Sequence, residues 1–136
     1  MLAIIKSILA EETWPIRQKV MYPEFEIDKV KLSDDASGRH FGLFIGNELT
    51  VVVSIFVKGE ALQFRKLATL TAQQGKGYGR QMMQFILGLA SAENLKTVWC
   101  NARLSAANFY KTFGFEVFGE SWQQDGHEFT VMKKQL

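Results

Sequence analysis

The spacing of apolar residues predicts three consecutive β-strands in the first half of the chain. These segments are rich in Val, Ile, Leu and Phe and comprise residues 40–45, 49–57 and 61–70. Gly46-Asn47 separates the first two, and such a dipeptide is typical of a tight hairpin turn. A second turn at residues 58–60 leads into the third segment. We therefore expect an antiparallel meander.

Before the meander the pattern predicts one strand and one helix. Residues 2–7 fit a strand, and a helix begins near Thr13, with Pro15 tolerated in its first turn and Pro23 ending it. The stretch that follows is acidic and irregular, and its residues 33–38 are expected to form a surface loop.

After the meander the apolar residues recur at the spacing of a helix over residues 77–92. A strand at residues 96–101 follows. Because this helix separates it from the strand at 61–70, the two strands are expected to be parallel. The last elements are a short helix with Gly114 as its left-handed cap and a strand pair around Asp125-Gly126, at residues 105–112, 115–122 and 128–133.

This order (β, α, β-β-β, α, β, α, β-β) predicts an α/β fold, an α+β mixed sheet with helices on both faces. The chain has 136 residues, of which 47% are hydrophobic, and this suits one compact core. We expect residues 1–136 to form a single domain.

Charge and composition narrow the range of partners. Sixteen basic and fourteen acidic side chains give a formal net charge of +2, and no basic stripe suggests a nucleic-acid partner. No apolar run of about twenty residues occurs, so we expect no membrane partner and a cytoplasmic location. Cys100 is the only cysteine, which excludes an internal disulfide and argues against a zinc cluster, so no metal is expected. Its apolar strand favours a buried structural thiol over a nucleophile.

The segment between the third strand and the second helix is the clearest candidate for chemistry. It carries three glycines and two cations, in the order Gln74, Gly75, Lys76, Gly77, Tyr78, Gly79, Arg80. Glycines let backbone N–H groups approach a ligand, and the start of a helix favours phosphate oxygens. The spacing matches neither a P-loop nor the dinucleotide fingerprint, which would need glycine where Arg80 stands. By itself the loop indicates an anion-binding cradle or an ordinary strand–helix turn.

A second segment separates these alternatives. The pattern Gln74-x-x-Gly77-x-Gly79 resembles the acyl-CoA pyrophosphate motif of the GNAT superfamily of N-acyltransferases. Residues 108–115 resemble that family's later motif, an aromatic-Tyr pair followed by Gly-Phe, and residues 64–69 resemble its central strand. The chain looks most like small bacterial members. The resemblance implies an N-acetyltransferase that moves an acetyl group from acetyl-CoA to a primary amine of a small molecule or peptide.

The resemblance also implies roles for individual residues. The backbone near Leu67, Ala68 and Thr69 would bind the pantetheine arm, and one of its N–H groups would stabilise the developing oxyanion. Residues 74–80 would hold the pyrophosphate. Tyr110 matches the usual general acid, which protonates the departing thiolate.

Two positions depart from the family pattern. Arg103 stands where an Asn usually contacts pantetheine, and Asn101 and Asn108 are nearby substitutes. Gln63 stands where some members carry a catalytic Glu, and an amide is no useful base. The base therefore stays unassigned between a water relay and five side chains, each of which we interpret first as solvated: Glu24, Glu26, His40, His127 and Glu128.

Other features leave alternatives open. Strict alternation would place Gln63, Arg65, Leu67 and Thr69 on one face, where Arg65 could meet an acidic substrate or form an ion pair with an acid of residues 24–35. The acids and aromatics of residues 14–39 and 122–128 would suit a cationic amine acceptor. Strands at the C-terminus could pair in a homodimer. The main alternative to an enzyme is a non-catalytic acyl-CoA-binding sensor, and a third is an interaction domain that binds no CoA.

Overall fold

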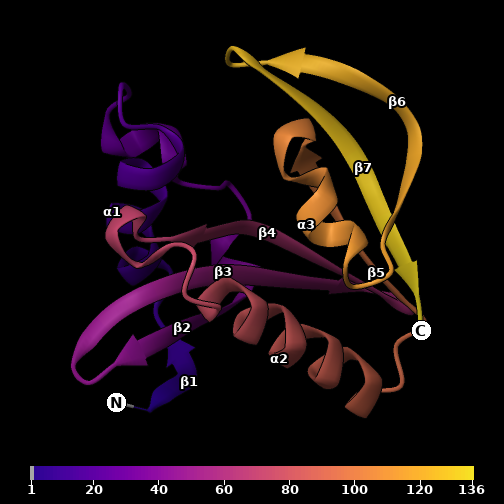
Figure 1. Cartoon of the computed structure of the whole chain (residues 1–136), viewed down its shortest axis with the longest axis horizontal. Helices are drawn as coiled ribbons and strands as arrows, with labels where there is room; N and C mark the ends of the chain where they lie inside the picture. The colour runs from indigo at the N-terminus through magenta and orange to yellow at the C-terminus, as the bar shows by residue number, and fades with distance from the viewer. Residues whose placement is uncertain (1) are drawn as a thin grey trace. The chain divides into compact units, whose positions relative to one another are not determined.

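The computed structural model describes residues 2–136. The strands are β1 (Ala3–Ile8), β2 (Arg39–Ile45), β3 (Glu48–Lys58), β4 (Ala61–Thr69), β5 (Thr97–Arg103), β6 (Glu116–Gln124) and β7 (His127–Gln135). The α-helices are α1 (Ala10–Met21), α2 (Tyr78–Ala92) and α3 (Ala107–Lys111), and short 3-10 turns are η1 (Ile27–Val30), η2 (Asp35–Ser37), η3 (Thr71–Gln73) and η4 (Leu104–Ala106). The described strands form a sheet in the order β1-β2-β3-β4-β5-β7-β6 (Figure 1).

The pairing of the strands confirms the predicted mixed sheet. Strands β1 to β2, β2 to β3, β5 to β7 and β6 to β7 pair antiparallel. Strands β4 and β5 pair in parallel, with Ala61 opposite Thr97 and Gln63 opposite Trp99. Helix α2, which connects β4 to β5, is therefore the crossover between parallel strands that the sequence predicted.

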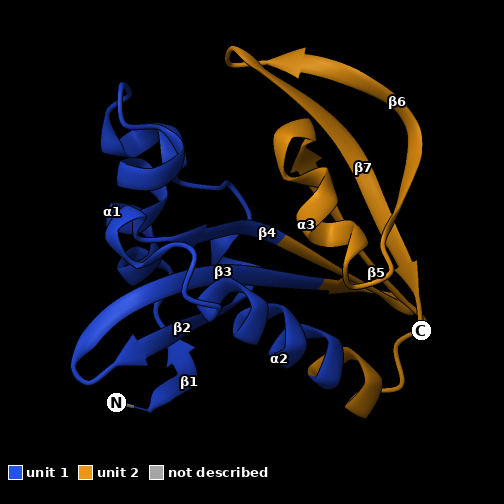
Figure 2. Cartoon of the chain, viewed as in Figure 1, with its two compact units in different colours: residues 1–56, 65–88 blue, residues 57–64, 89–136 orange. Residues whose placement is uncertain are grey.

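The chain divides into two compact units (Figure 2). The first contains Met1–Phe56 and Arg65–Gly88, and the second contains Val57–Phe64 and Leu89–Leu136.

In the first unit, helices cover both faces of the sheet. Ile16 of α1 lies in one buried cluster with Val52 and Ala68. On the opposite face the ring of Phe41 meets Phe85 of α2, with ring centroids 4.9 Å apart. Phe41 pairs with Val53, which is adjacent to Val52 and so points to the other side of the strand. The amphipathic pattern of each helix therefore matches a different face of the same strands.

In the second unit, α3 supplies an aromatic core. The ring of Tyr110 lies 5.6 Å from that of Phe64 and 6.0 Å from that of Phe115. Phe64 and Phe115 are almost fully buried, as are Cys100 and Met132 of the neighbouring strands. Burial of these aromatic side chains fixes Tyr110 in place.

The predicted turns are confirmed by their backbone. Gly46 and Gly59 join the strands of the meander with φ of 59° and 58°. Asp125 and Gly126 have φ of 52° and 79° in the last hairpin, and Gly114 has φ of 90° after α3. The left-handed conformation was expected of Gly114, and the other residues adopt it at positions that were predicted as turns.

The start of α1 differs from the prediction. The helix begins at Ala10, so Pro15 lies in its second turn and not its first. The carboxylate of Glu12 accepts a hydrogen bond of 2.6 Å from the Leu9 N–H. This bond caps the helix at Leu9, before the predicted start at Thr13. Pro15 therefore removes one donor from within the helix.

The predicted surface loop at residues 33–38 is only partly exposed. Asp35 in it is 6% exposed, because its carboxylate is bonded to Arg17 of α1. The loop is therefore anchored to the core of its unit through this one side chain.

Candidate functional site

The loop before α2 has the backbone of an anion cradle. Gly75 and Gly77 adopt φ of 78° and 87°, a region in which a side chain is strained. The Gln81 N–H bonds to the Gly77 carbonyl over 3.0 Å and closes the first turn of the helix. The N–H groups of Tyr78 and Gly79 precede that bond and have no helical acceptor. Together with the helix dipole they favour an anion at this end.

The loop also has room for a ligand. A Cβ built on Gly75 or Gly77 meets no atom within 4 Å, so these glycines are required by conformation and not by crowding. Gln74 donates to the Thr69 carbonyl over 3.1 Å, which ties the loop to the end of β4. Lys76 donates to the Gln73 side chain over 3.0 Å and stays exposed. A pyrophosphate fits this donor set, because the loop offers backbone N–H groups, a cation and open space.

Strand β4 does not alternate strictly, contrary to the prediction. The Arg65 guanidinium lies 5.9 Å from the ring centroid of Phe56, and Ala68 packs with Val52. Phe56 and Val52 share one face of β3, so Arg65 and Ala68 share a face although three positions separate them. Lys66 between them has φ of 57°, and this left-handed residue reverses the alternation. Leu67 and Thr69 therefore face the side opposite to Arg65.

Arg65 forms the structural ion pair that was one of its two alternatives. Its guanidinium lies 3.3 Å from the Asp34 carboxylate, and the two side chains are 31% and 46% exposed. A pair so exposed to solvent contributes little stability.

Tyr110 is a buried phenol whose hydroxyl is available. The residue is 8% exposed, and burial, followed by the neighbouring Cys100 thiol, raises the pKa of Tyr110 well above its usual value. Among residues 2–136 its hydroxyl has no hydrogen-bond partner. The side chain therefore stays protonated at neutral pH and offers a donor.

Cys100 is the buried structural thiol that was predicted. It is 3% exposed, and burial raises the pKa of its thiol to about 12. A thiol that stays protonated is a poor nucleophile.

The predicted site residues belong to both of the compact units. Residues 67–69 and 74–80 belong to the first unit. Asn101, Asn108 and Tyr110 belong to the second, where both asparagines are exposed on β5 and α3. Gln63 also lies in the second unit, opposite Trp99 in the parallel ladder.

His40 was interpreted as a solvated side chain, and this was wrong. It is 7% exposed, with Nδ1 at 2.6 Å from the Ser54 hydroxyl and Nε2 at 2.8 Å from the Asp35 carbonyl. The Asp35 carbonyl can only accept, so Nε2 carries a hydrogen, and Nδ1 of a ring with one hydrogen then accepts from the Ser54 hydroxyl. Both ring nitrogens are engaged, so His40 has a structural role.

The buried network around Arg17 was missed by the sequence analysis. Its guanidinium makes two bonds of 3.0 Å to the Asp35 carboxylate and one of 2.9 Å to the Val30 carbonyl. The one available signal was a charged residue adjacent to Ile16, on the apolar side of the helix.

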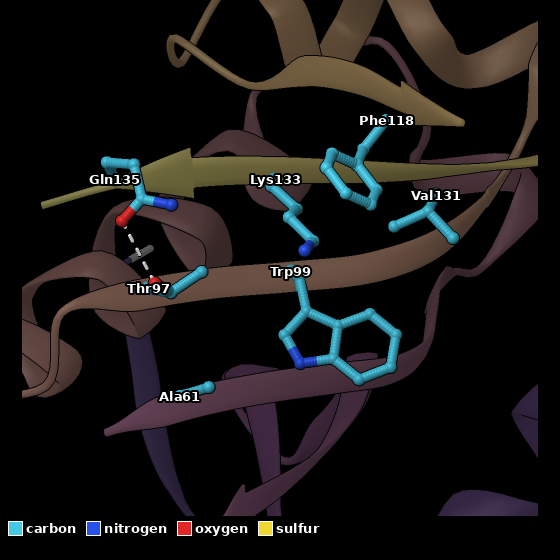
Figure 3. A pocket seen from close by; sticks show the side chains of 7 residues that line it. All are labelled: Ala61, Thr97, Trp99, Phe118, Val131, Lys133 and Gln135. Atoms are coloured by element: carbon cyan, nitrogen blue, oxygen red, sulfur yellow. Dashed lines mark hydrogen bonds between the residues drawn. The ribbon is translucent and has the colours of Figure 1, made fainter. Parts of the chain in front are cut away.

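The pocket shown in Figure 3 lies on the sheet of the second unit. It encloses about 400 Å³ and is lined by Ala61, Thr97, Trp99, Phe118, Val131, Lys133 and Gln135. The Lys133 ammonium lies 3.7 Å from the centroid of the Phe118 ring, and Thr97 bonds to Gln135 over 3.0 Å. None of the predicted site residues lines this pocket.

Among residues 2–136, no helix has both the length and the apolar character that crossing a membrane requires.

Comparison with known proteins identifies the class of enzyme and the family of this chain. The model of the acetyltransferase (GNAT) domain matches residues 27–136. The protein called uncharacterized N-acetyltransferase YitI of Bacillus subtilis is 26% identical over 131 residues, which are 90% of this chain and 88% of that protein. The sheet, the loop and this match define an acyl-CoA-dependent N-acyltransferase. The chain belongs to the GNAT acetyltransferase family.

Solved structures agree with the fold. A crystal structure of a candidate N-acetyltransferase from Lactobacillus plantarum is similar over 100% of this chain and 99% of its own, with a TM-score of 0.86 and 20% identity. A GNAT family acetyltransferase from Elizabethkingia anophelis with acetyl-CoA bound is similar over 98% of each chain, with a TM-score of 0.77 and 15% identity.

Proposed function

We propose that this enzyme transfers the acetyl group of acetyl-CoA to a primary amine of a small molecule or peptide. The observation that carries the proposal is the cradle at the start of α2, where Gly75 and Gly77 hold left-handed backbone and leave open space. We further propose that both units act as one domain, because the family match spans residues of each.

In this proposal the donor is held mainly by backbone. The pyrophosphate binds the loop formed by Gln74, Gly75, Lys76, Gly77, Tyr78, Gly79 and Arg80. The backbone of Leu67, Ala68 and Thr69 binds the pantetheine arm and stabilises the oxyanion. Asn101 and Asn108, both exposed, supply further polar contacts to the donor.

The reaction is direct transfer. A neutral amine attacks the acyl carbon, a C–N bond forms, the C–S bond breaks, and the sulfur leaves with its electron pair. The nitrogen loses one proton to solvent water, and the sulfur gains one. Tyr110 donates a hydrogen bond to the departing sulfur, because its hydroxyl has no partner among residues 2–136, and a proton that passes from it to the thiolate is replaced from solvent water.

A homodimer through β6 forms part of the proposal. This strand is an edge of the sheet formed by the described residues, and its Val117 and Phe118 are 46% and 59% exposed. An unpaired edge offers backbone groups to the same strand of a second copy. Light scattering of the purified chain tests this, and a mass of one chain at all concentrations would contradict it.

Thermal shift and turnover together test the function. We expect acetyl-CoA and CoA to raise the melting temperature, and NAD and ATP to leave it unchanged. Free thiol released from acetyl-CoA with a broad amine panel reports turnover. CoA binding without turnover of any amine would favour the acyl-CoA sensor, and absence of CoA binding would favour an interaction domain.

A further inference from the structure

Lys66 combines a strained backbone with a central position. It has φ of 57° inside strand β4, where a residue with a Cβ rarely adopts the left-handed region. Such strain persists only where the surrounding structure enforces it, and it is concentrated at functional sites. The conformation turns the Lys66 side chain towards Tyr22, the C-cap residue of α1.

The ammonium of Lys66 is half-buried and lacks an acidic partner. Its Nζ donates to the Tyr22 hydroxyl over 3.2 Å and lies 4.8 Å from the centroid of the same ring. No carboxylate of residues 2–136 forms an ion pair with it. A buried charge usually has a counter-charge, and a phenol supplies only one of the acceptors that three ammonium hydrogens can use.

The nearby charges do not supply the missing anion. Asp34 is occupied by Arg65 at 3.3 Å, and Asp28 by Lys31 at 2.9 Å. A second cation, Lys29, lies 4.9 Å from the Phe25 ring centroid and 5.8 Å from that of Tyr22. The ammonium group of Lys66 therefore lies against an aromatic ring and a phenol oxygen, and an anionic group of a ligand would supply the acceptor that it lacks.

We propose that Lys66 binds a carboxylate of the acceptor, so that the preferred acceptor carries an anionic group next to its amine, as an amino acid does. This inference rests on the proposed function, in which the next residues, Leu67 to Thr69, hold the thioester arm. Lys66 directly precedes these residues in β4, so the proposed carboxylate site and the proposed thioester site belong to the same stretch of strand. Lys66 thereby determines specificity and does not take part in the proton transfers.

Paired acceptors test the inference. The purified chain with saturating acetyl-CoA is assayed with the twenty amino acids and with their carboxamides, which keep the amine and lose the negative charge. We expect kcat/KM to be at least about tenfold higher for the preferred acid than for its amide, the range of a charge-assisted hydrogen bond. Lys66→Asn, which tolerates the left-handed backbone, should reduce this ratio to within about twofold through KM, with kcat retained.

Two further variants separate charge from folding. Lys66→Arg should keep the preference for the acid, and Lys31→Asn, which removes a cation paired with Asp28, should leave the ratio unchanged. A wild-type preference for amides, or an unchanged ratio in Lys66→Asn, would overturn the inference and leave the acetyltransferase assignment intact. If no amine is turned over although CoA binds, both the proposed function and this inference fail.

Discussion

Arg17 of α1 and Asp35 of η2 form a buried two-point ion pair, with both N···O distances at 3.0 Å. Arg17 is 0% exposed and Asp35 is 6% exposed. The pair joins the first helix to the loop that follows it, and Ser54 extends the contact to strand β3 over 2.7 Å. The loop that carries Asp34, the partner of Arg65, is held in place by this contact.

Removing one partner of this pair should destabilise the protein strongly. Asp35→Ala leaves the Arg17 guanidinium buried without its counter-charge, and we expect a loss of about 3–5 kcal/mol in the free energy of unfolding. Urea unfolding with an unchanged m-value measures the loss. Arg17→Met combined with Asp35→Ala should be less destabilised than Asp35→Ala alone. A single variant within about 1 kcal/mol of the wild type would contradict this role.

The same carboxylate should make stability sensitive to acid. Burial alone would raise the pKa of Asp35, but bonds from Arg17, the Leu32 N–H and Trp14, together with the charge of Arg17, lower it below its usual value of 3.8. A carboxylate whose folded pKa is lowered stabilises the fold above its unfolded pKa, and this contribution is lost as pH falls through the folded value. We expect the urea concentration at the midpoint of unfolding to decrease as the pH falls below about 4. In Asp35→Asn this midpoint should depend less on pH. An equal pH dependence in Asp35→Asn and the wild type would contradict the assignment.

The sequence predicts those features of the fold that neighbouring residues determine, and it does not predict those that contacts between distant residues determine. The hairpins are set by Gly46 and Gly59, whose conformations need no distant residue, and the helix between β4 and β5 makes these two strands parallel. The reversal at Lys66 is marked by no glycine, and the burial of Asp35 depends on Arg17, which lies far along the chain. Alternation rules could not reveal either. The predicted site residues follow from motifs, and their roles stay predictions.

The thiol of Cys100 should be inert in the folded protein. Burial raises its pKa to about 12, so almost no thiolate forms at pH 8. We expect reaction with Ellman's reagent to be at least about a hundredfold slower in the native state than in urea. A raised thiol pKa also implies stability that is present below the unfolded pKa and lost as pH rises towards the folded value. Rapid native labelling at pH 8 would contradict the burial.

The cradle glycine can be tested against a matched glycine of the adjoining helix. Gly77→Ala places a side chain at φ of 87°, and a strain of about 1–2 kcal/mol should weaken acetyl-CoA binding about tenfold. Gly88→Ala within α2 meets no atom within 4 Å and should stabilise the fold by about 0.5–1 kcal/mol with binding unchanged. Calorimetric titration with acetyl-CoA measures the affinity of each variant, and urea unfolding measures the stability of Gly88→Ala. Equal affinity in Gly77→Ala and the wild type would show that this backbone does not hold the ligand.

Tyr110→Phe separates the hydroxyl of Tyr110 from its ring. The ring packs against Phe64 and Phe115, and the variant keeps it. The hydroxyl has no partner among residues 2–136, so its loss should change the free energy of unfolding by less than about 1 kcal/mol. If the hydroxyl donates to the departing sulfur, kcat should fall about a hundredfold while the dissociation constant of CoA stays within about twofold. Because the pKa of Tyr110 is raised, the wild-type kcat should show no loss attributable to its ionisation up to pH 10. An unchanged kcat would remove Tyr110 from the chemistry and leave it as part of the aromatic core.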